Sequence, residues 1–174
     1  MQNRTLRQLT AAGVIAAAYA ALSLVLATTT FGPVQCRISE ALTLLPVISP
    51  AAIWGVTLGC AVTNGVGAAT GTNFLGLVDL PVGTAATLLA AVATRLLGKI
   101  RFGGLPWLSA LPPILINAVA IGGEWCYAMT GSINGAFWVF AGQIALGQLP
   151  PCLLGVWLVG LLERRSLQTI IEGK

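Results

Sequence analysis

Six stretches of apolar residues with almost no charged residues inside them constrain this chain more than any other feature. A transmembrane helix needs about 20 such residues to cross about 30 Å of hydrocarbon. Only 8% of the 174 residues are charged, against about 25% in soluble domains. We therefore predict an all-α polytopic membrane protein, with residues 1–174 forming a single integral membrane domain. The six predicted spans run from about Leu6 to Ala27, Ile38 to Ile48, Ala51 to Gly67, Leu80 to Leu97, Leu105 to Trp125 and Ala136 to Leu162.

The composition also excludes several classes of protein. The net charge of +4 comes from only nine cations and five anions, which excludes a disordered chain, a basic nucleic-acid binder and a disulfide-rich secreted scaffold.

Arg4 and Arg7 before the first apolar stretch resemble the start of a signal peptide. That stretch is longer than a signal peptide needs and five more follow, so we predict that it is retained. We also expect the fifth span to be kinked at Pro112 and Pro113.

The distribution of lysine and arginine predicts the orientation, because cytoplasmic loops carry an excess of both. With six spans and both termini in the cytoplasm, every basic cluster falls on the cytoplasmic side. Arg37 is the only cation that falls outside, which makes it a candidate functional residue. The cytoplasmic clusters are Arg4 and Arg7; Arg95, Lys99 and Arg101; and Arg164, Arg165 and Lys174.

Polar residues within the spans gather at the ends that this topology directs outward. A charge in hydrocarbon costs about 2.5 to 3.5 kcal/mol and usually marks a functional site. The set holds three acids and one arginine, so a cavity that they line has a formal charge of −2. Such a cavity favours a cation or a flat molecule with several N–H donors. The predicted ligand-binding residues are Arg37, Glu40, Asn64, Asp79, Asn117, Glu124 and Gln143.

The spacing of these residues along the chain places some of them on the same helix face. A structural role instead of ligand binding remains an alternative for several. Arg37 and Glu40 are three residues apart and are expected on one helix face, as a site or as an internal ion pair. Asn117 and Glu124, seven apart, share a stripe. Asn64 and Asn117 are also explained by hydrogen bonds between helices. Asp79 is equally able to cap the fourth span.

Catalytic and metal chemistry find little support in the sequence. The chain has no histidine, and its four cysteines form no Cys-x-x-Cys pair, so we predict no metal and no cofactor. A bridge between Cys36 and Cys126 stays open. Gly98-Lys99 is not a Walker A motif because Ala93 stands where the first glycine is required. Any ATP-driven step therefore belongs to another subunit, and we predict that this chain is not an enzyme.

Small residues repeat every four positions in the first span, at Ala12, Ala16 and Ala20. Such stripes allow helix backbones to approach closely in lipid. The stripe is explained either by packing within this chain's own bundle or by a surface for a partner helix.

Four segments together resemble the QueT family: Val34 to Pro46, with Arg-Ile-Ser-Glu-Ala-Leu as its most specific part; Gly59 to Asn64; Asp79 to Leu89; and Pro113 to Asn117. Those proteins are substrate-binding S components of energy-coupling factor importers in bacteria. The resemblance implies a six-helix, multi-pass protein of the bacterial plasma membrane that binds a queuosine precursor, a deazaguanine base such as the aminomethyl pre-queuosine base or queuine. It also implies docking on a T component, through Ala12, Ala16 and Ala20, and two partner ATPases.

Four other functions are compatible with some of these sequence features. An S component for another cationic vitamin-like ligand fits the same acidic cavity. A self-sufficient secondary carrier normally shows two related halves, and we see no such repeat. An intramembrane enzyme could use Glu40, Asp79 and Glu124 as acid and base, but no nucleophile motif or metal set accompanies them. A purely structural subunit leaves the outward acids unexplained.

Overall fold

The computed structural model describes residues 2–32 and 34–164, and in these ranges the chain is helical apart from loops and one isolated bridge between Phe102 and Leu105. The helices are α1 (Gln2–Val25), α2 (Ala27–Thr30), η1 (Ile38–Val47), α3 (Ala51–Thr70), η2 (Gly76–Val78), α4 (Asp79–Leu97), η3 (Trp107–Ala110), α5 (Leu111–Thr130) and α6 (Phe137–Arg164).

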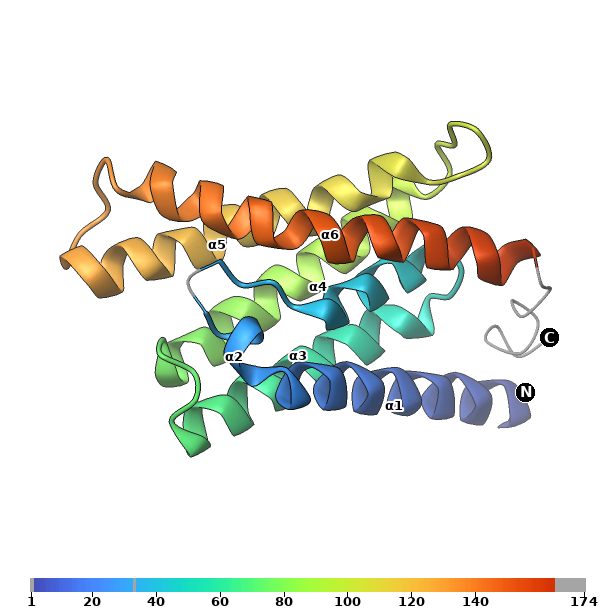
Figure 1. Ribbon diagram of the computed structural model, residues 1–174. Helices are drawn as coiled ribbons and strands as arrows, with labels where there is room; N and C mark the ends of the chain where they lie inside the picture. Colours follow the sequence, from blue (N-terminus) through green and yellow to red (C-terminus); the bar gives the residue numbers. More distant parts are fainter. Residues whose placement is uncertain (1, 33, 165–174) are drawn as a thin grey trace.

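Five helical segments are long and apolar enough to cross a membrane, and η1 is a shorter apolar helix. The long helices and η1 lie side by side, and α1 begins at the same end of the bundle at which α6 ends (Figure 1). The short second span was expected near Ile38 to Ile48, and the structure places a helix over Ile38–Val47. It is a 3₁₀-helix, whose rise of about 2 Å per residue lets ten residues reach about 20 Å.

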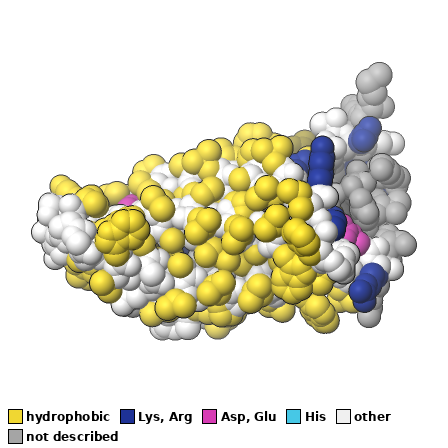
Figure 2. Space-filling model, turned by 90° about the horizontal axis from the view of Figure 1, so that it is seen from above, with side chains coloured by type: hydrophobic (Ala, Val, Ile, Leu, Met, Phe, Trp, Pro, Cys, Tyr) yellow, Lys and Arg dark blue, Asp and Glu magenta, His cyan; other side chains and the backbone are white. Residues whose placement is uncertain are grey.

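The two ends of the bundle differ in charge. Lysine and arginine side chains gather at one end, and hydrophobic side chains cover most of the length between the ends (Figure 2). We call this the basic end and the opposite one the far end. Arg165 and Lys174, two of the predicted cytoplasmic cations, lie outside the described residues. The described cations of the basic end are Arg4, Arg7, Arg95, Lys99, Arg101 and Arg164.

The alanine stripe of α1 packs against α3. Ala16 and Ala20 are buried, while Ala12 is partly exposed. A Cβ added at Gly59 of α3 would lie 2.7 Å from Tyr19 Cβ and 2.9 Å from the Ala16 carbonyl oxygen. The small residues therefore serve the close approach of α1 to α3. A partner surface at this stripe stays a prediction.

Two prolines of α5 take a different role from the expected kink. Pro112 and Pro113 lie in the first turn of the helix, where a missing backbone N–H leaves no hydrogen bond unmade. The expected kink at this position was therefore wrong, and the prolines mark a helix start. The prolines inside a long helix are Pro150 and Pro151 of α6.

The helix η1 is enclosed by its neighbours. A Cβ at Gly155 of α6 would lie 2.5 Å from the Ala41 carbonyl oxygen and 2.9 Å from Leu44, which is completely buried. At the other end of η1, Arg95 Nη1 donates to the Pro46 carbonyl at 2.8 Å. This packing fixes the start of η1, and with it Arg37 and Glu40, inside the bundle.

Candidate functional site

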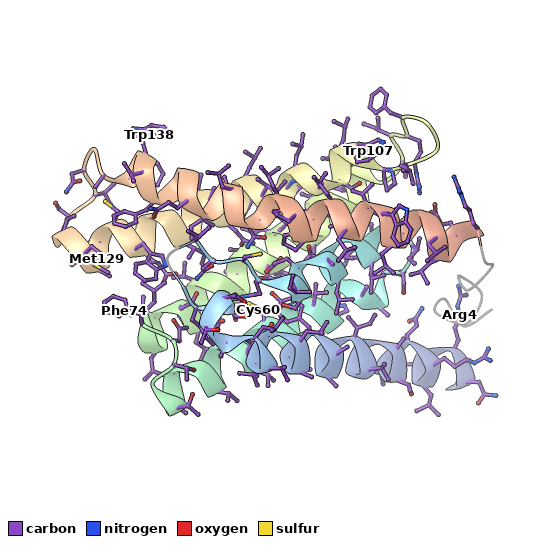
Figure 3. The ribbon with its side chains drawn as sticks, in the orientation of Figure 1. Arg4, Cys60, Phe74, Trp107, Met129 and Trp138 are labelled. Atoms are coloured by element: carbon purple, nitrogen blue, oxygen red, sulfur yellow. The ribbon has the colours of Figure 1, made fainter. Side chains whose placement is uncertain are left out.

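Four of the predicted site residues come together in the interior of the bundle. Arg37 precedes η1, Glu40 lies in its first turn, Asn64 lies near the end of α3 and Asp79 begins α4. Each is at most 5% exposed. We call these four residues the buried polar cluster. Cys60, which contacts Arg37, lies inside the bundle, with Phe74 toward the far end and Arg4 at the basic end (Figure 3).

Arg37 is a buried cation with incomplete hydrogen bonding. Its Nη2 donates to Asn64 Oδ1 at 3.3 Å, its Nη1 to Cys60 Sγ at 3.8 Å, and its guanidinium carbon lies 5.6 Å from the centroid of the Phe31 ring. Its Nε–H has no partner among the described residues. Because a buried charge is costly unless it is paired, this arginine presents a donor for a further acceptor.

Arg37 and Glu40 do not share a helix face as expected. Arg37 has an extended backbone, with φ −95° and ψ 100°, and comes before the helix. Glu40 Oε1 instead accepts a 2.6 Å hydrogen bond from Tyr19 of α1. Within the described ranges no salt bridge joins Arg37 to a carboxylate. The alternative of an internal ion pair is therefore wrong, and Glu40 Oε2 is left buried without a partner.

Asp79 is held by two asparagines. Asn73 Nδ2 donates to Asp79 Oδ2 at 2.7 Å, and Asn64 Nδ2 donates to the Asp79 backbone carbonyl at 3.0 Å. Asp79 Oδ1 is buried without a partner. Asp79 does not cap its helix, because the N-cap of α4 is Val78 and the cap carries no side-chain hydrogen bond. The carboxylate thus faces the interior.

Glu124 on α5 lies close to the carboxyl of Asp79. The residue is only partly buried, but both carboxylate oxygens are shielded from solvent and have no partner among the described residues. Glu124 also forms part of the wall of an open cavity of about 310 Å³ near the far end. The other lining residues are Leu75, Val78, Gly123, Tyr127, Ala128 and Ile133.

The remaining two predicted residues are not joined to this cluster. Asn117 is buried on α5, two turns before Glu124, and no hydrogen bond among the described residues links it to the other four. Gln143 lies on α6 with its Oε1 buried and unpartnered. Their roles in ligand binding stay predictions.

The sequence did not identify several residues that surround the cluster. Tyr19 interrupts the run of alanines in α1, and this interruption is the sequence feature that could have pointed to it. Asn73 and Gln35 lie in loops, and Gln35 is buried with φ +35° and a free Nε2. Trp125 is buried in a stack between Phe74 and Phe140.

The cysteines and acids of the described residues form no group of three or more that could hold a metal ion. Cys36 and Cys126, for which a bridge was left open, are both free. The buried polar cluster offers one free N–H of Arg37 and free carboxylate oxygens of Glu40 and Asp79, and Glu124 outside the cluster adds two more free oxygens.

The family comparison covers nearly all of the chain. The model of the family described as QueT transporter matches residues 9–164. No curated protein and no solved structure matches the chain.

Proposed function

This chain belongs to the QueT transporter family, and on that premise we propose that it is the substrate-capture component of an energy-coupling factor importer for a queuosine precursor. In this proposal the ligand is a deazaguanine base, such as the aminomethyl pre-queuosine base or queuine. The protein lies in the bacterial plasma membrane with both termini in the cytoplasm, and it binds its ligand from the outside.

The observation that carries the proposal is the buried polar cluster with its unpartnered atoms. Buried polar groups in proteins are almost always hydrogen-bonded. Here Arg37 Nε, Glu40 Oε2 and Asp79 Oδ1 all lack partners among the described residues. Leaving such groups unpaired costs about 1 to 3 kcal/mol each, and a ligand that pairs with them removes this cost.

The donors and acceptors of the cluster complement a guanine-like edge. The free Oε2 of Glu40 can accept one N–H bond from such an edge, and Oε1, which already accepts from Tyr19, keeps a second lone pair for another. The free N–H of Arg37 suits the ring carbonyl oxygen. The excess of acids over arginine favours a ligand that also carries an amine. Asn117 and Gln143 complete the proposed binding residues.

The proposal assigns the energy source to other subunits. The sequence has no Walker A motif, so two partner ATPases would drive transport through a T component, and this chain would not be an enzyme. We propose that the T component docks on α1. The stripe of Ala12, Ala16 and Ala20 is largely occupied by α3, while the neighbouring stripe of Gly13, Ala17 and Ala21 is exposed.

Uptake of labelled aminomethyl deazaguanine into proteoliposomes tests this function. We expect the chain alone to bind the base without accumulating it under an ion gradient. Accumulation should require the T component, the two ATPases, and ATP on the side of the membrane at which the ATPases lie. Accumulation by the chain alone would instead identify a self-sufficient secondary carrier. If the reconstituted complex takes up thiamine-like cations and not the base, the ligand is another cationic vitamin.

A further inference from the structure

Gln35 combines two features that are unfavourable in a folded protein. Its backbone has φ +35°, and among the described residues it is the only one other than glycine with a positive φ, a conformation that a side chain disfavours. Its side chain is 3% exposed, and the amide nitrogen Nε2 is buried with no hydrogen-bond partner in the described part of the chain. An unpaired buried donor also costs free energy. Backbone strain of this kind is typical of positions that bind ligands.

The surrounding backbone holds Gln35 in this conformation. A Cβ added at Gly147 of α6 would overlap the Val34 carbonyl oxygen and lie 3.0 Å from the Gln35 carbonyl carbon, so the backbone of α6 lies directly against this segment. The Gln35 N–H donates to the Gly32 carbonyl at 2.9 Å, and the Gln35 carbonyl accepts from the Arg37 N–H at 3.0 Å. Gln35 is therefore fixed along the chain on both sides and by the packing of α6.

The bond to Arg37 joins Gln35 directly to the buried polar cluster. The Nε–H of Arg37 is buried and has no partner among the described residues, as is the case for Gln35 Nε2. This short segment before η1 therefore carries two free donors, whereas Glu40 Oε2 and Asp79 Oδ1 are free acceptors. A carbonyl oxygen has two lone pairs, so one carbonyl group can accept from both donors.

We propose that Gln35 is a specificity-determining residue whose Nε2 donates, beside Arg37 Nε–H, to the carbonyl oxygen of the bound base, and that its strained backbone places this amide. The inference rests on the proposed function and adds to it the residue that reads one substituent of the ring. A base with a strong acceptor at this substituent pairs both donors. A base with a weak acceptor leaves buried donors unpaired and binds less tightly.

The first test is a calorimetric titration of the full chain in detergent with aminomethyl deazaguanine (the oxo base) and with the same base carrying sulfur in place of the carbonyl oxygen (the thio base). Sulfur is a weak acceptor, so the wild-type chain should bind the oxo base about tenfold tighter than the thio base. Gln35→Met keeps the length of the side chain and removes its donors. It should bind the oxo base about tenfold more weakly than wild type and reduce the preference to about threefold. Gln8→Met, near the start of α1, is the matched control and should change neither affinity.

The second test measures the backbone strain in the unliganded protein. Gln35→Gly and Gln35→Ala lose the same amide and differ in the Cβ, so Gln35→Gly should unfold about 2 to 4 °C above Gln35→Ala. Val34 has no positive φ, and there the order should be reversed, with Val34→Ala unfolding above Val34→Gly. Both Gln35 variants should bind the oxo base about tenfold more weakly than wild type.

The outcomes separate this inference from the proposed function. If the wild-type chain binds the oxo base and Gln35→Met keeps the wild-type preference over the thio base, the donation by Gln35 is wrong and the capture function stands. The same conclusion follows if the wild-type chain binds both bases equally, or if the glycine and alanine variants bind the oxo base as wild type does. Placement by a strained backbone is wrong if Gln35→Gly does not unfold above Gln35→Ala. If the folded wild-type chain binds neither base, both the function and this inference are overturned.

Discussion

The basic end and the buried polar cluster both combine arginine with carboxylates, and they differ in how completely these groups are paired. At the basic end, Arg101 forms two hydrogen bonds of 2.8 Å with the two oxygens of Glu163. Both side chains keep partial contact with solvent, at 30% and 26% exposure. In the buried polar cluster, Arg37 forms no salt bridge among the described residues, and the acids keep free oxygens away from water. The first arrangement is complete by itself, and the second leaves buried polar atoms without a partner among the described residues.

Arginine and carboxylate side chains have different roles at the basic end and in the buried polar cluster. The Arg101–Glu163 pair joins the segment between α4 and η3 to the end of α6, and partly exposed pairs of this kind contribute at most about 1 kcal/mol. Arg37 and Glu40 lie in the interior, where unpaired polar groups are far more costly. Substitutions at the basic end and in the buried polar cluster should therefore separate effects on stability from effects on binding.

The largest effect is expected for Glu40→Gln. The amide cannot accept from a ligand N–H with the strength of a charged carboxylate, and its NH₂ group opposes a ligand donor. We expect the Kd for aminomethyl deazaguanine to rise about 100-fold, which corresponds to about 2.7 kcal/mol. Calorimetric titration measures it, with Glu163→Gln as the matched control at the basic end. An unchanged Kd in Glu40→Gln would remove Glu40 from the site.

Gly83→Ala should have the next largest effect. A Cβ at this position would lie 2.5 Å from Asp79 Oδ1 and 2.6 Å from Asn64 Nδ2, so the methyl group must displace both side chains. We expect binding of the base to weaken about 30-fold. Gly142→Ala is the control, because a Cβ there meets nothing within 4 Å. Equal affinities in the two variants would show that the positions of Asp79 and Asn64 do not matter for binding.

Tyr19→Phe tests the support of Glu40 from α1. The substitution removes the hydroxyl that donates to Glu40 Oε1 at 2.6 Å and keeps the packed ring. We expect about tenfold weaker binding, or about 1.4 kcal/mol, because a second carboxylate oxygen then lacks a fixed partner. A thermal unfolding scan of the unliganded protein checks the fold. Binding equal to wild type would mean that the Tyr19–Glu40 contact does not orient the acid.

The smallest effect is expected for Arg101→Gln at the basic end. Loss of the Arg101–Glu163 pair should lower the free energy of unfolding of the unliganded protein by at most about 1 kcal/mol. The Kd for the base should stay within about twofold of wild type. Thermal unfolding and titration of the same sample measure both quantities. A loss of affinity as large as that of Glu40→Gln would erase the distinction between the basic end and the buried polar cluster.

Much of the architecture followed from the sequence, because apolar stretches long enough to cross a membrane leave few alternatives. The positions of α3, α4 and η1 agree with their predicted spans to within a few residues. The rotation of each helix about its axis did not follow, since in lipid both the packed and the exposed face are apolar. For that reason the sequence could not show that Ala16 and Ala20 face α3, or that Tyr19 turns toward Glu40.

The candidate site was only partly predictable for a related reason. Polar side chains within the predicted spans pointed to Arg37, Glu40, Asn64 and Asp79, and the structure brings these four together. Asn73 lies in a Gly- and Thr-rich loop whose sequence gives no sign of its 2.7 Å contact with Asp79. The extended backbone at Arg37 depends on how α3 and α6 enclose the segment before η1, which no local pattern records.

The central claim is that the buried polar cluster binds a deazaguanine base. The most direct test is a parallel calorimetric titration of the purified wild-type chain with the aminomethyl pre-queuosine base, queuine and guanine. We predict saturable binding of at least one deazaguanine, about tenfold or more tighter than that of guanine. Absence of binding by all three bases, in a sample that is folded by thermal unfolding, would contradict it.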